Sequence, residues 1–572
     1  MDINQRDSDI LDIALSFLVM FCSVFIGTAI FMFFDKGIGV WQFPVFSFVG
    51  MMIYSFLRFS EDESFGLRKG ILYFLIYILV VSVLALIVQN VWDPSIDGRW
   101  YHSEAVIRLT DGWNPVYYKL ENVGKWSYYY CKATWYTAAN IAEFLGDPER
   151  GKVYNVFFEL VTVIISLPFF RRFFNTKNYV IPAMGAVLMF LNPVAWSQRF
   201  TFYQDSTLGL LLMDVIMLSF FVWRDKNGKY RKSNLMALFC AAAFLSNVKF
   251  TGLAYASVYL FVFLILFFVT RERKQAMKLL GFLAVSFVVI TMLLGYSPYV
   301  KNAVEEGNPF YPLMGKDAED IMTPNTPEAL KDMNYLQKFV ASQYLPPNND
   351  LSEEYSFESG DLFEMKDRKN YAEPDPRIRG FGILSFALVP MTLILAVIYL
   401  FLNGRNKKFF FVIFFSVILV GVVSKEIWWA RYFSYFWIMP ALVMCAFFNN
   451  EGTLHRFFGS LLFIVVFVNG IHYMVNSVPY QIEKSDITKL EVEDVRLNGT
   501  VDFLYDVLNR NHFRLWYREK LGYPLSGVIE KEDIIKKKEE DMKDVKAINE
   551  RIEMLKERTQ LDDDDLEEKR NN

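Results

Sequence analysis

Long hydrophobic runs separated by short polar connectors recur along the first 474 residues of the chain. Most have about 18 to 25 residues, the length that an α-helix needs to cross the hydrocarbon core of a bilayer. The pattern predicts an all-α polytopic membrane protein. We expect about thirteen transmembrane helices, at residues 10–34, 38–57, 70–91, 153–170, 178–196, 203–223, 234–248, 252–270, 279–297, 381–402, 409–424, 432–449 and 457–474.

Two connectors are much longer than the others and divide the chain. The predicted parts are the N-terminal helices 1–91, a first large loop 92–152, helices 153–297, a second large loop 298–380, helices 381–474 and a soluble charged tail 475–572. In the tail, Val545, Ile548, Ile552 and Leu555 recur at spacings of three and four residues. That spacing predicts a short coiled coil or a surface helix.

Basic residues collect in alternate short connectors, and short basic connectors stay on the cytoplasmic side of a membrane. The basic set comprises Arg58, Arg68, Lys69, Arg171, Arg172, Lys177, Arg224, Lys226, Lys229, Arg231, Lys232, Arg271, Arg273, Lys274, Lys278, Arg405, Lys407 and Lys408. We therefore expect a multi-pass protein of the plasma (inner) membrane with a cytoplasmic N-terminus. Both large loops would be exterior, and an odd number of spans would make the tail exterior as well.

Composition narrows the function classes. Of the 572 residues, 53% are hydrophobic and 21% charged, against about 25% charged in soluble domains. The net charge of −4 argues against nucleic acid as a partner, because binding a polyanion usually needs a basic face. The four cysteines imply no disulfide framework. No Walker loop, GxGxxG or CxxC pair supports nucleotide hydrolysis or zinc chemistry. Partners are therefore expected in the lipid bilayer.

Two acids of the predicted exterior side are candidate catalytic residues. Asp97 lies five residues before His102, just after the third span. Asp97 would suit a general base for an alcohol, and His102 would orient it, share a metal or hydrogen-bond a substrate. Asp97 is equally suited to cap the next helix. Asp205 heads the sixth span, where it is either a site residue or an interface anchor.

Three cations on the same predicted side suit a phosphate. Lys301 follows the ninth span, Lys249 lies in Asn247-Val248-Lys249-Phe250-Thr251-Gly252, and Arg431 lies in Trp428-Trp429-Ala430-Arg431-Tyr432. Such cations bind either lipid headgroups in general or the phosphate of one lipid substrate. A Gly-Asn-Pro turn with Asn308, Pro309 and Tyr311 gives the loop after Lys301 a fixed shape, as a substrate loop or as a simple turn.

These motifs resemble the integral-membrane glycosyltransferases of the GT-C fold. That superfamily includes the protein O-mannosyltransferases and the aminoarabinose transferases, and the nearest pattern is that of a poorly characterised bacterial branch. The resemblance covers roughly residues 70 to 450 and rests on four motifs, in order and on one predicted side. They are Asp97 with Tyr101-His102, Asp205 after Tyr203, Lys249-Phe250-Thr251-Gly252, and Gly307-Asn308-Pro309-Phe310-Tyr311-Pro312.

The resemblance implies transfer of a sugar from a polyprenyl-phosphate or polyprenyl-diphosphate donor to an acceptor hydroxyl on the exterior face, with inversion. Asp97 would be the general base. Lys301, Lys249 or Arg431 would bind the donor phosphate, and Asp205 would bind the acceptor or support Asp97. The Phe-rich spans would line a groove for the prenyl tail. No cofactor is certain, and a divalent cation, Mg or Mn on Asp97 and Asp205, is left open.

Other classes stay open at this stage. The acceptor of a transferase would be a glycan, a lipid or a protein. An O-antigen-type polysaccharide polymerase also has many spans and large exterior loops, although the sequence lacks a pair of Arg-dense exterior loops. A transporter or lipid flippase would use charged groups within the spans, such as Glu159 and Asp214, but no internal repeat accompanies them.

Overall fold

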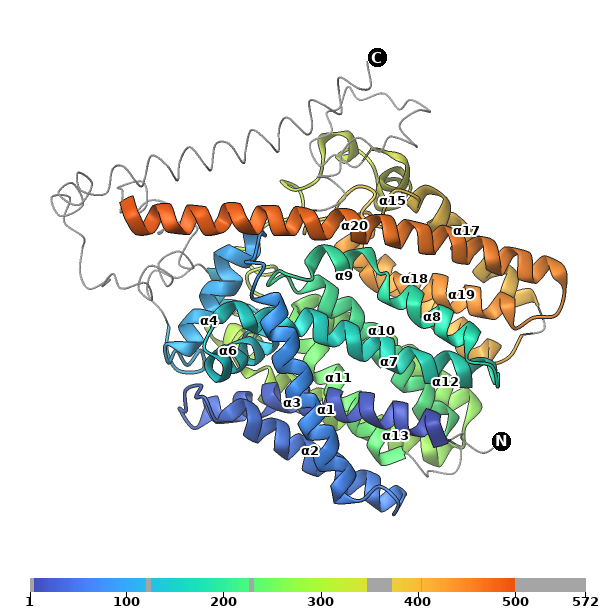
Figure 1. Cartoon of the computed structure of the whole chain (residues 1–572), viewed down its shortest axis with the longest axis horizontal. Coiled ribbons are helices and arrows are strands. Elements are labelled where there is room, and N and C mark those ends of the chain that lie inside the picture. The colour runs from blue at the N-terminus through green and yellow to red at the C-terminus, as the bar shows by residue number, and fades with distance from the viewer. Residues whose placement is uncertain (1–4, 120–124, 226–230, 347–372, 403, 499–572) are drawn as a thin grey trace.

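The computed structural model describes residues 5–119, 125–225, 231–346, 373–402 and 404–498, and every regular element within them is helical. The long helices are α1 (Gln5–Phe33), α2 (Gln42–Glu61), α3 (Leu67–Val88), α7 (Tyr154–Phe174), α8 (Val180–Phe190), α10 (Asp205–Arg224), α11 (Arg231–Val248), α12 (Phe250–Thr270), α13 (Arg273–Val288), α17 (Ser385–Phe401), α18 (Lys407–Ser424), α19 (Ile438–Phe448) and α20 (Thr453–Asn498). Figure 1 shows their arrangement.

Shorter helical segments lie between the long helices or extend them. They are η1 (Gly98–His102), α4 (Ser103–Thr110), α5 (Lys125–Tyr129), α6 (Ala133–Leu145), η2 (Pro148–Val153), α9 (Pro193–Gln198), η3 (Val289–Leu294), η4 (Tyr296–Lys301), α14 (Asn302–Glu305), η5 (Glu328–Leu330), α15 (Tyr335–Tyr344) and η7 (Ala430–Trp437).

Each of the thirteen predicted runs lies on a helix. In the described part of the chain, ten helical stretches are long and apolar enough to cross a membrane. The helices α8 and α17 are apolar but shorter, and the remaining run lies in α11. The prediction of an all-α polytopic membrane protein is confirmed, whereas the count of thirteen spans is not.

The helix α20 is longer than the hydrophobic run that predicted it. The apolar run ends at residue 474, but α20 continues to Asn498. Its extension keeps a buried polar face: Gln481 Nε2 donates to the carbonyl oxygen of Trp196 (2.9 Å), and Ser485 Oγ accepts from the backbone N–H of Trp92 (2.7 Å). The start of the predicted tail is thus packed on the first large loop. The predicted coiled coil at 545–555 lies outside the described residues.

Contacts between connectors place three members of the predicted basic set, Arg58, Arg171 and Arg405, at one end of the bundle. Arg58 at the end of α2 pairs with Asp12 near the start of α1 (2.7 Å). Arg405, which precedes α18, donates to the carbonyl oxygen of Phe174 at the end of α7 (3.3 Å). Arg171 and Asp7 form a further pair at this end. The first large loop and the start of α10 therefore lie at the opposite end.

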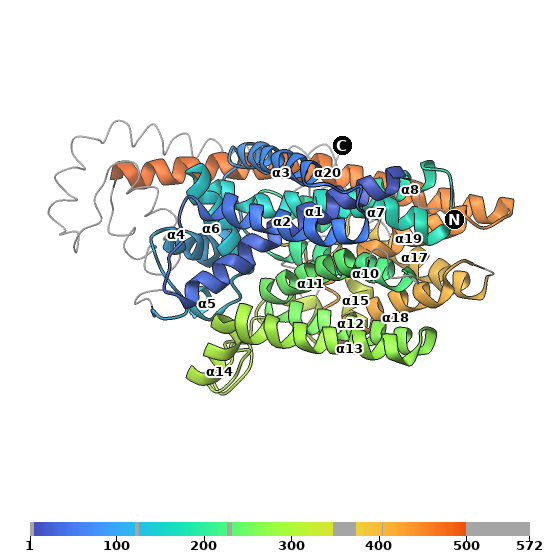
Figure 2. The same cartoon turned by 90° about the horizontal axis from the view of Figure 1, so that it is seen from below.

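The helix α10 is the central element of the bundle. It packs against both α7 and α11, and almost all of its spanning stretch is buried. In the second view, α12 and α13 form one edge of the molecule, and α3 and α20 lie near the other (Figure 2). The N-terminus of α10 is thus placed at the centre of the end that carries the large loops.

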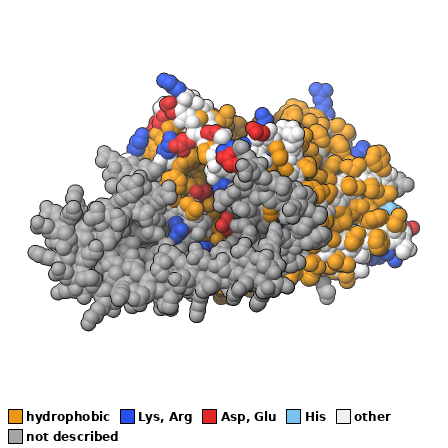
Figure 3. All heavy atoms as spheres, turned by 90° about the horizontal axis from the view of Figure 1, so that it is seen from above, with side chains coloured by type: hydrophobic (Ala, Val, Ile, Leu, Met, Phe, Trp, Pro, Cys, Tyr) orange, Lys and Arg blue, Asp and Glu red, His pale blue; other side chains and the backbone are white. Residues whose placement is uncertain are grey.

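The outer surface is apolar where the helices would meet lipid. Figure 3 shows hydrophobic side chains over the part of the molecule that α17 and the first half of α20 occupy in Figure 1. More than half of the spanning stretch of α2 is not buried inside the protein. The same holds for most of the spanning stretches that contain α3 and α13. Such broad apolar exposure suits a lipid environment, where hydrocarbon replaces protein as the packing partner.

Candidate active site

The turn that carries Asp97 is held by a buried aspartate next to it. One carboxylate oxygen of Asp93 accepts hydrogen bonds from the N–H and Oγ of Ser95 (2.7 and 2.6 Å), and the other accepts from the N–H of Phe202 (2.6 Å). A Cβ on Gly98 would lie 2.0 Å from Asp93 Oδ2, so this close approach requires glycine. Asp93 therefore fastens the first large loop to the segment that enters α10.

Four of the predicted site residues come together around Arg431 in η7. Arg431 Nη1 lies 3.8 Å from Asp97 Oδ2 and 3.9 Å from Asp205 Oδ2. Lys249, which immediately precedes α12, forms a salt bridge with the other oxygen of Asp205. Three of the four side chains are buried, whereas 30% of the Asp97 side chain is exposed. The sequence placed these residues on one side, and the structure gathers them into one cluster.

A fifth member, Asp375, was missed by the sequence analysis. Its Oδ1 lies 3.1 Å from Arg431 Nε and accepts a hydrogen bond from Trp429 Nε1 (2.7 Å). The guanidinium of Arg431 also lies over the rings of Trp429 and Tyr203, with its carbon 4.4 and 5.3 Å from their centroids. The only local signal for Asp375 was an acid enclosed by two prolines, which many surface turns share.

Two buried polar atoms of this cluster are left without hydrogen bonds. Among the described residues, neither Arg431 Nε nor Asp205 Oδ2 has a hydrogen-bond partner, although both lie close to opposite charges. Unpaired polar groups of this kind are costly when buried. A polar ligand that formed hydrogen bonds with these two atoms would remove that cost.

Lys301 does not join the cluster in any contact of the described residues. Its Nζ donates to the carbonyl oxygen of Pro115 (2.7 Å), lies 3.8 Å from Glu305 and sits over the ring of Tyr128. The predicted location of a donor phosphate at Lys301 thus gains no geometric support. The mouth of the ninth span places Lys301 at the correct end of the bundle but to the side of the four charges.

The predicted substrate loop packs near Lys249. Asn308 Oδ1 accepts from the N–H of Phe310 (2.9 Å), which closes the turn around Pro309. The ring of Phe310 contacts that of Phe250, the residue after Lys249, at a centroid separation of 6.0 Å. Tyr311 packs edge-on against Tyr129 of the first large loop. The loop therefore braces one wall of the site.

His102 is buried in an aromatic environment. Its ring lies 4.1 Å from that of Tyr101, and its Nδ1 accepts a hydrogen bond from Trp135 Nε1 (2.9 Å). Burial, and then the positive charges of Lys249 and Arg431, lower the pKa of His102 well below its usual value. The lowered pKa and the acceptor role of Nδ1 both favour the neutral imidazole, which suits His102 to hold Tyr101 and the turn in place.

The described acids of the cluster are paired with cations. Among the described residues, no group of three or more His, Cys, Asp or Glu side chains is placed to hold a metal ion. The carboxylates of Asp97 and Asp205 face Arg431, and Asp205 is also paired with Lys249. These donors do not fit Mg or Mn, so we assign no step to a cation.

The carboxyl group of Asp97 is shifted toward the protonated form. Burial raises its pKa, Arg431 and Lys249 oppose the rise, and the carboxylates of Asp375 and Asp205 reinforce it. Burial lowers the pKa of Lys249, and Asp205 opposes that change. A base with a raised pKa accepts a proton more readily than an ordinary aspartate does.

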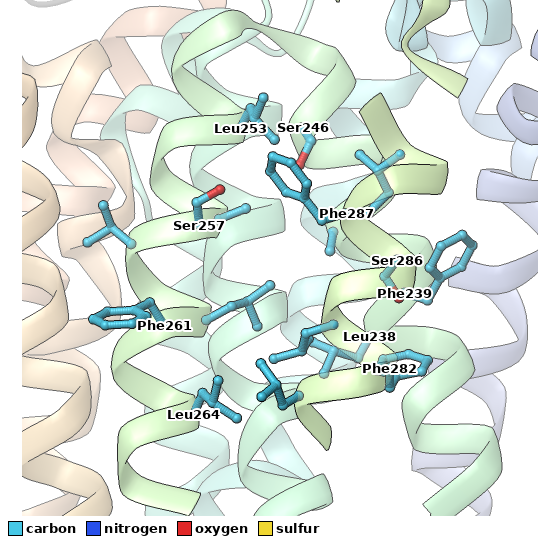
Figure 4. Close-up of a pocket in the computed structure, with 17 residues that line it drawn as sticks. Leu238, Phe239, Ser246, Leu253, Ser257, Phe261, Leu264, Phe282, Ser286 and Phe287 are labelled. Carbon is cyan, nitrogen blue, oxygen red and sulfur yellow. The ribbon is translucent and has the colours of Figure 1, made fainter. Parts of the chain in front are cut away.

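An apolar cavity of about 600 Å³ lies between α11, α12 and the stretch formed by α13 and η3. Figure 4 shows Ser246 and Leu253 at one end of the cavity and Leu264 toward the other. Phe261 and Phe287 on its border are 64% and 50% exposed, so the cavity opens on the outer surface. Ser246 and Leu253 lie within four residues of Lys249 in the sequence, so this end of the cavity faces the end of the bundle that carries the charged cluster.

Comparison with solved structures yields two distant matches. No family model and no curated protein matches the chain. ArnT from Cupriavidus metallidurans in the apo state is 14% identical, with 74% of this chain and 80% of that chain covered and a TM-score of 0.37. The same protein bound to undecaprenyl phosphate is 15% identical, with 78% and 88% covered and a TM-score of 0.33.

Proposed function

We propose that the protein is an inverting glycosyltransferase that moves a sugar from a polyprenyl-phosphate or polyprenyl-diphosphate donor to an acceptor hydroxyl. One observation carries the proposal: a partly exposed carboxylate, Asp97, stands beside the buried cations Arg431 and Lys249, at the end of the bundle toward which an apolar cavity with an opening on the outer surface extends. A lipid-linked phosphate needs this combination of an apolar groove and a cationic end.

The cations supply the electrostatic part of the reaction. When the bond between the sugar and the phosphate breaks, negative charge develops on the leaving phosphate. Arg431 Nε is a buried donor without a hydrogen-bond partner among the described residues, and Lys249 lies on the other side of Asp205. Both charges are fixed before the donor arrives, so little reorganisation is needed as the charge develops. Lys301 has no part in this assignment.

Asp97 supplies the proton transfer. The acceptor hydroxyl attacks the anomeric carbon, its proton passes to the Asp97 carboxylate, and the bond from that carbon to the phosphate oxygen breaks. Asp97 suits this role because its side chain is the most exposed of the three acids around Arg431. Asp205 is buried and paired, so it would support the cluster and the acceptor.

The raised pKa of Asp97 predicts the pH dependence of transfer. The base works only when deprotonated, so kcat/KM should fall as pH decreases through a pKa above the ordinary aspartate value. Asp375→Asn removes a negative neighbour and should move this acid limb to lower pH. The profile of kcat/KM from about pH 4 to 8 measures both positions. A limb that does not move, or that moves upward, would contradict the assignment of Asp97.

The proposal is tested by mass spectrometry of polyprenyl-linked lipids from cells that produce the native chain or Asp97→Asn. We expect the variant to accumulate one polyprenyl-phosphate sugar, which would identify the donor. Asp332→Asn is the matched control, because Asp332 is an exposed acid of the second large loop. An unchanged lipid pool at equal protein levels would count against the transferase and favour a transporter. Accumulation of polyprenyl-linked oligosaccharide would favour the polymerase.

A further inference from the structure

Asp375 holds the cation that the proposed reaction needs for a phosphate. Of the three carboxylates around Arg431, Asp375 comes nearest to the guanidinium, at 3.1 Å, against 3.8 Å for Asp97 and 3.9 Å for Asp205. The contact brings charges together but is not a hydrogen bond, because Arg431 Nε has no hydrogen-bond partner among the described residues. The carboxylate therefore occupies the position of an anionic ligand without satisfying the donor.

We propose that Asp375 is an internal substitute for the donor phosphate. Its carboxylate neutralises Arg431 while the site is empty, and it gives way when the phosphate of the lipid-linked sugar binds to the same guanidinium. The inference rests on the proposed function, and it assigns to Asp375 control over the affinity for the donor. Carboxylate and phosphate oxygens are the two anionic ligands that the guanidinium fork accepts in the same manner.

When a phosphate binds to Arg431, one of the three carboxylates around this cation has to move away or be protonated. Asp97, Asp205 and Asp375 all approach Arg431, and a bound phosphate would add negative charge to the same place. Like charges at short range disfavour each other unless one moves or is protonated. Asp97 is needed as the base, and Asp205 is held by Lys249. Of the three carboxylates, only that of Asp375 can move away from Arg431 without removing a group that the proposed reaction uses.

The surroundings of Asp375 allow its carboxylate to leave Arg431. Its second oxygen accepts a hydrogen bond from Arg377 Nε (3.1 Å), so the carboxylate retains a cationic partner. Arg377 is itself fixed by Asn325, to whose carbonyl and side-chain oxygens it donates at 2.8 Å. One fifth of the Asp375 side chain is exposed. A rotation of the side chain toward Arg377 gives up the hydrogen bond from Trp429 Nε1 and frees Arg431 while the backbone stays in place.

The test measures binding of farnesyl phosphate to the full chain in lipid nanodiscs. Asp375→Asn keeps the shape of the side chain and removes its charge, so farnesyl phosphate should bind about tenfold more tightly, which corresponds to about 1.4 kcal/mol. Asp375→Glu retains the carboxylate and should bind as the native chain does. Asp332→Asn, on the same loop, should leave the affinity unchanged. Farnesol has the same chain without phosphate, and its binding should not respond to Asp375→Asn.

The outcomes separate this inference from the proposed function. If Arg431→Ala weakens binding of farnesyl phosphate but Asp375→Asn leaves it unchanged or weakens it, Asp375 only orients Arg431 and the inference is wrong. If Asp375→Asn increased the affinity for farnesol as much as the affinity for farnesyl phosphate, the inference would also be wrong, because the effect would not depend on the phosphate. If binding ignores Arg431→Ala as well, the phosphate site itself is wrong, and the proposed function falls together with the inference.

Discussion

Replacing Asp97 with asparagine should reduce sugar transfer by at least about 10²-fold, the lower end of what a positioned general base contributes. Asparagine has nearly the same shape but cannot take the proton of the acceptor hydroxyl. Asp97 stands 3.8 Å from Arg431, and Asp205 and Asp375 also contact that cation, so the cluster should stay assembled without the Asp97 charge. The loss should therefore appear in kcat and leave donor affinity nearly unchanged.

The measurement is turnover of the lipid-linked donor by purified protein in nanodiscs, with donor affinity determined separately. Asp332→Asn serves again as the control, because it removes an exposed acid away from the cluster. Turnover within a few-fold of the native value would exclude Asp97 as the base. A large rise in the Kd of the donor at unchanged kcat would instead assign Asp97 to binding.

The fold was predictable because its signal is long and repetitive. Each transmembrane helix has about 20 mostly apolar residues, so a few polar residues within the run do not obscure the pattern. The C-terminal end of α20 was not predicted. Its apolar run stops at residue 474, whereas the helix continues with Gln481 and Ser485 facing buried backbone groups of other segments. Hydropathy reports lipid contact, and this extension packs against protein instead.

The candidate site was predictable in part, because the alternation of basic connectors assigns each polar residue to an end of the bundle. Asp97, Asp205, Lys249 and Arg431 were placed at one end, and the structure gathers them. Lys301 shows what that reasoning lacks. The alternation of basic connectors tells at which end of the bundle a residue lies, but it does not tell which residues lie next to it at that end. Lys301 is at the predicted end, yet it contacts Tyr128 and Pro115 and not the charged cluster.

Asp375 could not be singled out from the sequence because its loop is rich in acids. Nothing in the run Glu373-Pro374-Asp375-Pro376 separates it from the other carboxylates of residues 298–380. Its position depends on long-range contacts: Trp429 donates to Asp375, and Gln198 Nε2 donates to the carbonyl oxygen of Pro374 (3.1 Å). Pairings between segments so far apart leave no periodic trace in the sequence.

The second large effect should come from the buried pair of Lys249 and Asp205. Both side chains are less than 10% exposed, and their salt bridge links α12 to the start of α10. Lys249→Met should destabilise the protein by about 3–5 kcal/mol, because it leaves a buried carboxylate whose other cation is 3.9 Å away. Thermal unfolding of the protein in nanodiscs measures the loss, and Asp205→Leu should cause a loss of similar size.

The double variant Lys249→Met/Asp205→Leu separates a structural role from a catalytic one. Replacing both members of a buried ion pair by apolar groups is often neutral or stabilising, so the double variant should regain most of the stability that each single variant loses. Transfer should stay low, because the double variant lacks the charge that the proposed mechanism places beside the leaving phosphate. If activity returned together with stability, Lys249 and Asp205 would only hold α10 and α12 together, and Arg431 alone would have to stabilise the phosphate.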